Sequence, residues 1–247
     1  MIKVGVIGSA GKMGTLACET VDAAADFELV ARVDEGDSVS ELEGADVAVD
    51  FTHPGAVMDH VAWCIKHGVH MVVGTSGFTE ERLGIIREQL GDNPAVGVLV
   101  VPNFSIGAAL MMRFAAEAAK FFESAEIIEL HHPTKLDAPS GTSIRTAQLI
   151  AEARTSAGLA AMPDATQENS LGSRGGTVDG VAVHSVRARG LVAHQEVILG
   201  NLGETLTIRH DMADRAAAMP ALVAAVRAVV DLPGLTVGLE RVLGLPT

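Results

Sequence analysis

The sequence predicts an α/β protein in two unlike parts, a doubly wound parallel sheet followed by an α+β domain with a mixed, largely antiparallel sheet. Two observations carry this prediction. Up to residue 101, short apolar runs rich in β-branched residues alternate with helical patterns, as in a parallel sheet covered on both faces. Beyond residue 180, strand-like runs follow one another and alternate apolar with polar residues, as in an antiparallel sheet with two unlike faces.

Each element is expected from its local pattern. In the first part, strands are expected at residues 4–7, 27–33, 45–51, 69–73 and 96–101, and helices at residues 12–24, 55–66 and 79–90. In the second part, helices are expected at residues 106–122 and 143–157, and strands at residues 125–131, 181–189, 191–199 and 204–210. Residues 158–177 are expected to form a long loop, and residues 216–230 a last helix.

Composition and charge exclude several classes of protein. The chain of 247 residues is 48% hydrophobic, which is too apolar for a disordered protein. Its 18 Lys and Arg against 31 Asp and Glu give a net charge of −13, which disfavours nucleic acid as a partner. The two cysteines, Cys18 and Cys64, offer no disulfide framework, and we expect no signal peptide and no membrane span. A cytoplasmic protein is therefore expected.

A glycine-rich loop directly follows the first expected strand and opens a helix. Its residues are Gly8-Ser9-Ala10-Gly11-Lys12-Met13-Gly14. The start of a helix has free N–H groups and a partial positive charge, and glycines let a pyrophosphate approach the backbone. A tight turn without a ligand is the alternative interpretation of the same spacing.

The second expected strand leads to Asp34, where a dinucleotide-binding domain has a carboxylate for the adenosine ribose hydroxyls. Strand, glycine loop, helix and carboxylate together indicate a Rossmann-type domain. Asp34 and Glu35 favour NADH because both would repel a 2′-phosphate, whereas Lys12 and Arg32 offer counter-charge. The cofactor is therefore expected to be NADH or NADPH, with dual use.

Two further loops belong to the same predicted ligand edge. They are Gly74-Thr75-Ser76-Gly77 and Pro102-Asn103-Phe104-Ser105, after strands that end at Val73 and Val101. In a parallel sheet, ligands bind at the carboxyl ends of the strands. Ordinary turn chemistry is the alternative for Gly77 and Phe104.

The densest polar cluster in the chain runs from the end of a strand to the start of a helix. It reads Glu129-Leu130-His131-His132-Pro133-Thr134-Lys135-Leu136-Asp137-Ala138-Pro139-Ser140-Gly141-Thr142. His131 or Lys135 could give a proton to a carbanion or enamine carbon after a hydride arrives. Ser140, Gly141 and Thr142 at a helix start suit a substrate carboxylate. Adjacent histidines on an extended segment point opposite ways, so no metal site is expected.

These three groups of residues resemble the 4-hydroxy-tetrahydrodipicolinate reductase (dihydrodipicolinate reductase) family over nearly the whole chain. The most specific match is Glu129–Thr142, which resembles the family pattern E-x-H-H-x-x-K-x-D-A-P-S-G-T. The resemblance implies reduction of 4-hydroxy-tetrahydrodipicolinate, with loss of water, to tetrahydrodipicolinate in the diaminopimelate and lysine pathway. It implies NADH or NADPH as the cofactor.

The resemblance also implies roles for single residues. His131 would be the acid/base residue, Lys135 the proton donor, and His132, Gly141 and Thr142, with Ser140 beside them, would bind substrate carboxylates. The residues that would line the cofactor are Gly8, Ser9, Ala10, Gly11, Lys12, Met13, Asp34, Gly74, Thr75, Ser76, Val101, Pro102, Asn103 and Phe104.

Domain boundaries and assembly follow from the same resemblance. Residues 1–104 and 213–247 would form the dinucleotide-binding domain, and residues 105–212 the substrate-binding and oligomerisation domain. Family members are typically homotetramers built through the sheet of the second domain. The partners expected are thus a small substrate with two carboxylates and other copies of the chain, without nucleic acid or membrane.

Two departures from the family pattern and two rival functions remain. Ser76 replaces a threonine of the usual Gly-Thr-Thr-Gly and keeps the hydroxyl. Glu35 stands where some relatives have an arginine, which lowers the expectation of an NADPH preference. One rival function is another two-domain dehydrogenase, and the other is a nucleotide-binding sensor without catalysis. An aldehyde dehydrogenase would need a nucleophilic cysteine in its catalytic domain, whereas Cys18 and Cys64 both fall in the nucleotide-binding half. A sensor would keep the glycine loop but has no need for His131 and Lys135.

Overall fold

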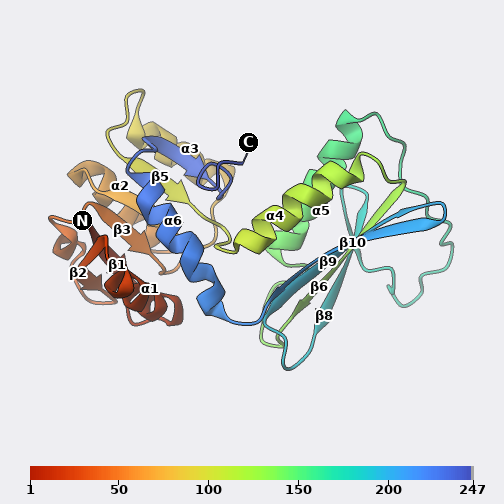
Figure 1. Ribbon diagram of the computed structural model, residues 1–247, viewed down its shortest axis with the longest axis horizontal. Coiled ribbons are helices and arrows are strands. Elements are labelled where there is room, and N and C mark those ends of the chain that lie inside the picture. The colour runs from red at the N-terminus through yellow and green to blue at the C-terminus, as the bar shows by residue number, and fades with distance from the viewer. Residues whose placement is uncertain (246–247) are drawn as a thin grey trace. The chain divides into compact units, whose positions relative to one another are not determined.

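A computed structural model describes residues 1–245 of the chain (Figure 1). The chain divides into two compact units, the first formed by Met1–Phe104 together with Arg215–Thr247, and the second by Ser105–Asp214. Each unit has its own sheet. Among the helices of residues 1–245, none combines the length and apolar character needed to cross a bilayer.

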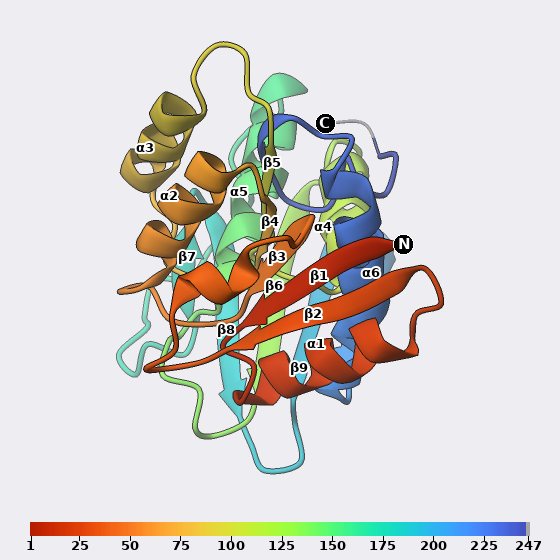
Figure 2. The ribbon, with the colours of Figure 1, turned by 90° about the vertical axis from the view of Figure 1, so that its left-hand side faces the viewer.

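The first unit contains a sheet of six parallel strands in the order β11-β5-β4-β3-β1-β2. Its strands are β1 (Ile2–Ile7), β2 (Phe27–Val33), β3 (Val47–Asp50), β4 (His70–Val73), β5 (Gly97–Val100) and β11 (Gly234–Val237). Helices α1 (Lys12–Ala23) and α6 (Met219–Val229) lie on one face, and α2 (Val57–His67) and α3 (Glu80–Leu90) on the other (Figure 2). A short 3-10 helix, η1 (Val39–Leu42), follows β2.

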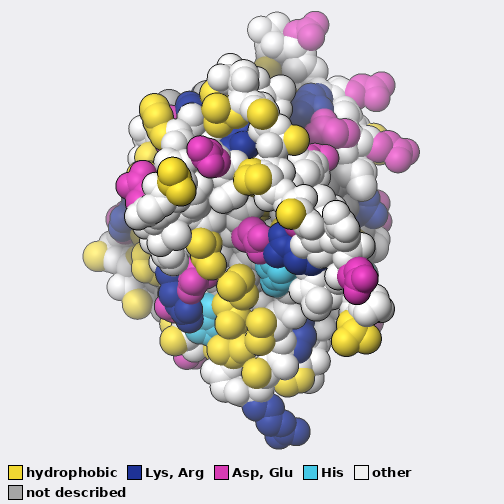
Figure 3. Space-filling view, turned by 90° about the vertical axis from the view of Figure 1, so that its right-hand side faces the viewer, with side chains coloured by type: hydrophobic (Ala, Val, Ile, Leu, Met, Phe, Trp, Pro, Cys, Tyr) yellow, Lys and Arg dark blue, Asp and Glu magenta, His cyan; other side chains and the backbone are white. Residues whose placement is uncertain are grey.

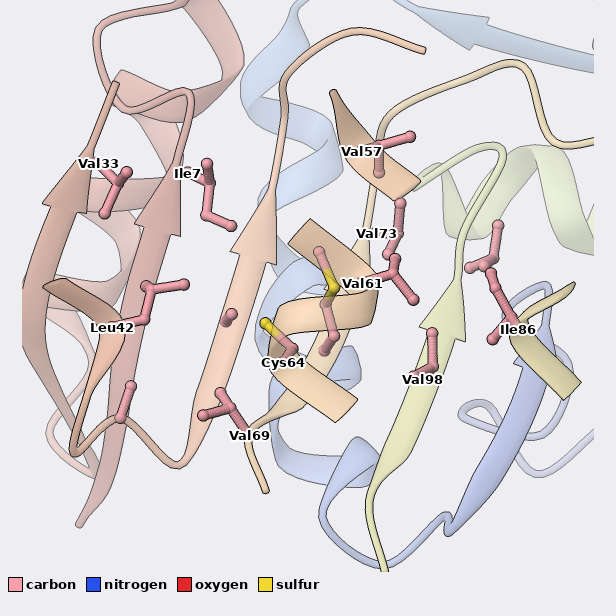
Figure 4. Packing of buried hydrophobic residues seen from close by; sticks show 14 of the residues in the cluster. Ile7, Val33, Leu42, Val57, Val61, Cys64, Val69, Val73, Ile86 and Val98 are labelled. Atoms are coloured by element: carbon pink, nitrogen blue, oxygen red, sulfur yellow. The ribbon is translucent and has the colours of Figure 1, made fainter. Parts of the chain in front are cut away.

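Apolar packing between the sheet and α2 and α3 holds this unit together. Figure 4 shows the core, in which Val61 and Cys64 of α2 pack with strand residues such as Val73 and Val98. All four residues are fully buried, and the strands read as continuous apolar runs. Gly5 in β1 allows Leu42 to pack closely on the strand, because a Cβ there would lie 2.3 Å from Leu42 Cδ2.

The second unit has a five-stranded mixed sheet in the order β10-β9-β6-β8-β7. Its strands are β6 (Ser124–His131), β7 (Gly176–Val178), β8 (Val181–Arg187), β9 (Ala193–Asn201) and β10 (Glu204–Met212). Only β6 and β8 pair in parallel; the other neighbours are antiparallel. Helices α4 (Ile106–Ala119) and α5 (Gly141–Ser156) pack on one face, over a core that includes Ile127, Ile150 and Leu199.

The predicted fold class is confirmed, and most elements lie within a few residues of their expected positions. Three details differ. The four-residue strand β11 was not expected, β7 begins inside the predicted loop, and α5 begins at Gly141 instead of residue 143. A 3-10 helix, η2 (Arg215–Ala218), precedes α6. The short strands are fixed by pairing with neighbours distant in sequence, a signal that local patterns lack.

Candidate active site

In the first unit, the predicted cofactor loops follow strands that all end at one edge of the sheet. Strand β1 lies between β3 and β2, so that the direction of winding reverses beside it. In open α/β sheets, such a switch point is where ligands bind. The glycine loop follows β1, Asp34 follows β2, Gly74 follows β4 and Val101 follows β5. We call these four loop starts the cofactor edge.

The glycine loop is shaped by contacts that exclude larger side chains. Gly8 has a φ of +80°, a left-handed conformation that favours glycine. A Cβ on Gly14 would lie 1.9 Å from the carbonyl oxygen of Gly8, so the start of α1 lies directly against the loop. Gly11 is the N-cap of α1, with no side-chain cap and no acidic residue in the first turn. This helix end can therefore accept an anion.

Asp34 contacts the glycine loop directly. Its carboxylate accepts hydrogen bonds from the backbone N–H of Ala10 at 2.5 Å and from that of Glu35 at 2.8 Å. These bonds, the one from Ala10 first, and a further one from the Ser9 side chain lower the pKa of Asp34 below its ordinary value. The side chain is therefore ionised at neutral pH. Arg32, which the sequence suggested as counter-charge, pairs instead with Asp22 at 2.8 Å.

The other two loops present mostly backbone atoms at the cofactor edge. The side chains of Thr75, Val101 and Phe104 are buried, whereas Ser76 and Pro102 are exposed. A Cβ on Gly74 would lie 2.2 Å from the Phe51 ring, which itself packs against Phe104 with centroids 5.5 Å apart. The predicted residues Lys12 and Met13 lie in the first turn of α1, and Asn103 lies between Pro102 and Phe104.

In the second unit, His131 at the end of β6 is part of an ionic cluster. Its Nδ1 lies 2.5 Å from Oε2 of Glu129, two residues earlier on the same face of the strand. The guanidinium of Arg187, at the end of β8, binds both carboxylate oxygens of Glu129 at 2.8 and 2.7 Å. We call Glu129, His131 and Arg187 the buried trio, because the Glu129 side chain is fully buried.

Burial and hydrogen bonding act in opposite directions on the protons of the buried trio. Burial raises the pKa of Glu129, but hydrogen bonds from Arg187, Ser185 and His131 more than offset this, and the pKa is lowered. Burial lowers the pKa of His131, and the bond to Glu129 restores only part of the loss. A neutral His131 therefore stands beside an ionised Glu129. Since a carboxylate only accepts hydrogen bonds, Nδ1 carries the proton and Nε2 is left with a lone pair.

Lys135 adds a second cation close to the buried trio in the chain. Its Nζ donates to Oδ1 of Asp137 at 2.7 Å, and its side chain is 21% exposed. Arg187 donates to the backbone oxygen of Asp137 at 2.8 Å. The arginine thus links the segment that carries Lys135 to the buried trio.

The predicted carboxylate-binding residues surround the start of α5. Ser140 is its buried N-cap, and its hydroxyl accepts from the Ser143 N–H at 3.2 Å. That hydroxyl is therefore engaged in the cap. Gly141 opens the helix beside open space, since a Cβ there would meet no heavy atom within 4 Å, and no acidic residue lies in the first turn. His132 turns away from Glu129, and its Nδ1 lies 2.8 Å from Oγ1 of Thr134.

Sequence reasoning did not assign Glu129, Arg187 or Asp137 a part in the site. Alternation along a strand could have found Glu129, since residues two apart share a face. Arg187 lies 58 positions from Glu129 and becomes its neighbour only through the β6–β8 register. Within residues 1–245, no three His, Cys, Asp or Glu side chains are grouped as a metal would need.

Comparisons with known proteins identify the family of the chain. A family model described as dihydrodipicolinate reductase, N-terminus, matches residues 2–104, and one described as its C-terminus matches residues 107–243. Proteins named 4-hydroxy-tetrahydrodipicolinate reductase from Cutibacterium acnes and Nocardia farcinica are 60% and 56% identical over 99% of this chain. The matches cover 100% and 99% of those proteins.

Solved structures extend the likeness to the fold. A dipicolinate-bound dihydrodipicolinate reductase from Paenisporosarcina sp. TG-14 has a TM-score of 0.84 and 39% identity, covering 98% of this chain and 99% of that one. A probable dehydrogenase from Thermotoga maritima, at 13% identity and a TM-score of 0.61, covers 98% of this chain and 92% of its own and shares only the fold. With both halves matched by the family models and relatives this similar over its full length, the chain belongs to the dihydrodipicolinate reductase family.

Proposed function

We propose that the protein reduces 4-hydroxy-tetrahydrodipicolinate to tetrahydrodipicolinate, with loss of water, using NADH or NADPH, in diaminopimelate and lysine biosynthesis. The observation that carries the proposal is the buried trio beside Lys135, in a chain that belongs to this reductase family. A nucleotide-binding sensor would have no use for a partly buried histidine that is held by a fully buried carboxylate and lies close to a lysine.

The proton chemistry is assigned to His131 and Lys135. Lys135 is the proton donor to the substrate carbon that becomes electron-rich once hydride has been added. Glu129 holds Nδ1 of His131, so Nε2 is the ring atom that exchanges a proton, and a positive charge formed on the ring is stabilised by the buried carboxylate. Arg187 keeps Glu129 ionised.

The residues of the cofactor edge fit a dinucleotide. The close approach of Gly14 to Gly8 leaves backbone where a pyrophosphate would lie, at the uncapped start of α1. Asp34 is the expected partner of the adenosine ribose, and Gly74 to Ser76 with Val101 to Phe104 would line the remainder through backbone atoms and the Ser76 hydroxyl. When bound, the dinucleotide supplies the hydride.

The preference between the two cofactors is assigned from charge. Asp34 is ionised and Glu35 is exposed beside it, which disfavours the 2′-phosphate of NADPH. Of the two cations that the sequence suggested as counter-charge, Arg32 pairs with Asp22, and Lys12 is exposed in the first turn of α1, where it could offset this. We therefore propose that both cofactors are used, with NADH bound at least as tightly.

The substrate carboxylates are assigned to the start of α5 and to His132. Gly141 and Thr142 contribute the helix end, whose partial positive charge suits an anion. Ser140 acts by capping this helix, since its hydroxyl is engaged with Ser143. Local cations are needed, since the chain as a whole has a net charge of −13.

We also propose a homotetramer that forms through the outer face of the second sheet, the face opposite α4 and α5. The apolar side chains that alternation puts there are Ile128, Leu130, Val186 and Ile198. Figure 3 looks onto the side of the molecule where this unit lies and shows hydrophobic side chains gathered beside histidines and charged groups. Light scattering tests the proposal: a mass of four chains supports it, and a mass of one chain refutes it.

A cytoplasmic location, with no nucleic acid or membrane as a partner, completes the proposal. Cys18 and Cys64 are both free and buried, as a reducing compartment allows. The net acidic charge would repel a phosphate backbone.

A coupled assay tests the reaction. A synthase makes the unstable substrate from pyruvate and aspartate semialdehyde, and the nicotinamide absorbance is followed with each cofactor. Oxidation that requires both the synthase and this protein is expected. A K135A variant should lower kcat about 100-fold and keep the Kd for NADH. K120A is the matched control, because Lys120 also pairs with a nearby carboxylate, that of Glu117 at 2.9 Å, away from the site.

The cofactor assignment has its own test. G14A should weaken NADH binding on the order of 100-fold, since the new Cβ must displace the Gly8 carbonyl. G84A is the matched control in the same unit, because a Cβ on Gly84 meets no atom within 4 Å. Equal NADH binding by the two variants would contradict the assignment, and a sensor would show binding without oxidation.

A further inference from the structure

A fully buried carboxylate, that of Asp50, lies at the end of β3 and has no part in the chemistry assigned above. Its Oδ1 accepts hydrogen bonds from the N–H and the hydroxyl of Thr52, at 3.0 and 2.8 Å, and from the hydroxyl of Thr75 at 2.6 Å. Its Oδ2 lies 2.7 Å from Nδ1 of His60. An ionised group in an apolar core is costly unless it is fully hydrogen-bonded, as this one is.

The partners of Asp50 come from three segments. Thr52 lies two residues after it, His60 belongs to α2, and Thr75 lies in the loop after β4, 25 residues away. The backbone of Asp50 holds the same loop, because its carbonyl oxygen accepts from the N–H of Gly74 at 2.9 Å. Backbone and side chain of one residue thus fix two successive residues of the cofactor edge.

This arrangement determines which atoms of the loop can meet a ligand. The Thr75 hydroxyl donates to Asp50 and its residue is only 4% exposed, so Thr75 can offer backbone atoms alone. On its other side, Gly74 lies against the rings of Phe51 and Phe104, where a Cβ would come within 2.2 and 2.8 Å. The loop is therefore held both by a carboxylate and by two aromatic rings.

We propose that Asp50 is a positioning residue for the cofactor loop that starts at Gly74, and that His60 acts on the same loop through Asp50. The inference rests on the proposed cofactor site. Asp50 sets the position of the Gly74 and Thr75 backbone and thereby the affinity for the dinucleotide. His60, on α2, holds the second oxygen of the carboxylate and prevents it from rotating away from Thr75.

The test measures the Kd for NADH by fluorescence, without substrate. T75V should raise this Kd about tenfold, as expected for the loss of one hydrogen bond to a charged group, and T75S should restore it to within about twofold. T236V is the matched control, since Thr236 is also 4% exposed and lies in the same unit on β11.

Variants of His60 distinguish two explanations of weaker NADH binding by T75V: a loop displaced through Asp50, or the loss of a direct contact between Thr75 and NADH. H60A should raise the Kd for NADH about threefold, and H60Q, whose amide can still donate to Asp50, should raise it less. The proposal fails if T75V binds NADH as T236V does, or if T75V weakens binding while H60A does not. If T75V does not fold, the pair H60A and H60Q tests the same claim. Because no substrate is present, a wrong assignment of the reaction would leave this result unchanged.

Discussion

Strand β6 has one glutamate on each of its two faces. Each of these glutamates binds a histidine and an arginine. On the helix-covered face are Glu129, His131 and Arg187, the buried trio. On the opposite face, Glu126 binds His184 at 2.7 Å and Arg174 at 2.7 Å; we call these three the outer trio. The residue types match and the shortest arginine contact is 2.7 Å in both, but the Glu129 side chain is fully buried whereas that of Glu126 is 36% exposed.

Burial is therefore what separates the two trios. In a single chain, water can solvate Glu126 if a partner leaves, so its ion pairs are worth little there. Water cannot reach the buried Glu129 in the same way. Removal of one of its partners therefore leaves a buried negative charge that no hydrogen bond compensates. The same three residue types can therefore hold a loop to the sheet on one face and transfer a proton on the other. The loop that precedes β7 is tethered in this way, since Arg174 also pairs with Asp164 at 3.3 Å.

The largest expected contrast is in turnover. E129Q removes the charge that fixes the Nδ1 proton of His131 and stabilises a charged ring, so kcat should fall about 100-fold. E126Q makes the same change three residues earlier on the same strand and should leave kcat within about twofold. Stopped-flow oxidation of NADH measures both, with the Kd for NADH as the check that the first unit is intact. Equal loss of kcat in the two variants would remove the distinction between the trios.

The next contrast is in stability. R187M leaves Glu129 buried without its main partner and should lower the free energy of unfolding by about 3 kcal/mol. In chains diluted until light scattering shows monomers, R174M exposes Glu126 to water and should cost less than about 1 kcal/mol. Urea unfolding followed by circular dichroism measures both. A cost for R174M as large as that for R187M would mean that the outer face is also closed off from water, as it would be inside a tetramer, so the mass of each variant must be measured alongside.

The two trios also mark how far the sequence alone could reach. Alternation in residues 125–131 could have put Glu129 and His131 on one face, although no prediction was based on it. The segment with His131 and Lys135 was predicted from residue types alone. Which arginine meets which glutamate depends on the β6–β8 register, and that register is fixed by burial across the whole sheet. The sequence alone does not show which face of the sheet is buried, because this depends on which face the helices α4 and α5 cover.

In the first unit, the glycine loop and Asp34 were predicted because their spacing follows from one local strand-turn-helix unit. Asp50 was not predicted, because its partners His60 and Thr75 lie 10 and 25 residues away in the sequence. An acidic residue at the end of an apolar strand is also common and does not by itself indicate a buried carboxylate. Strand β11 was missed because four residues, Gly234–Val237, become a strand only by pairing with β5. Sites built from one local strand-turn-helix unit can thus be predicted from the sequence, whereas contacts between residues far apart in the sequence cannot.

The smallest expected contrast is in the dependence of stability on pH. Burial lowers the pKa of His131 below its ordinary value of 6.5, so the unfolded chain binds this proton more readily than the folded one. The free energy of unfolding therefore falls as the pH drops from about 6.5 towards the pKa of His131 in the folded chain, because only the unfolded chain takes up this proton there. H131Q should flatten the loss of stability in this window, and the slope that remains comes in part from His70 and His210, whose pKa values burial also lowers.

The outer trio should act in a separate window. Hydrogen bonds, that of Arg174 first, lower the pKa of Glu126 below its ordinary 4.5 despite burial, so its contribution is complete above pH 4.5 and is lost as the pH falls through the folded pKa. E126Q should therefore change the slope only below pH 4.5, whereas H131Q changes it from about pH 6.5 downwards. Thermal unfolding of both variants between pH 3.5 and 7.5 measures the two slopes, at about 1.4 kcal/mol for each unit of pKa difference. A single window affected by both variants would show that the trios are coupled through β6 and would overturn the view that the two faces act independently.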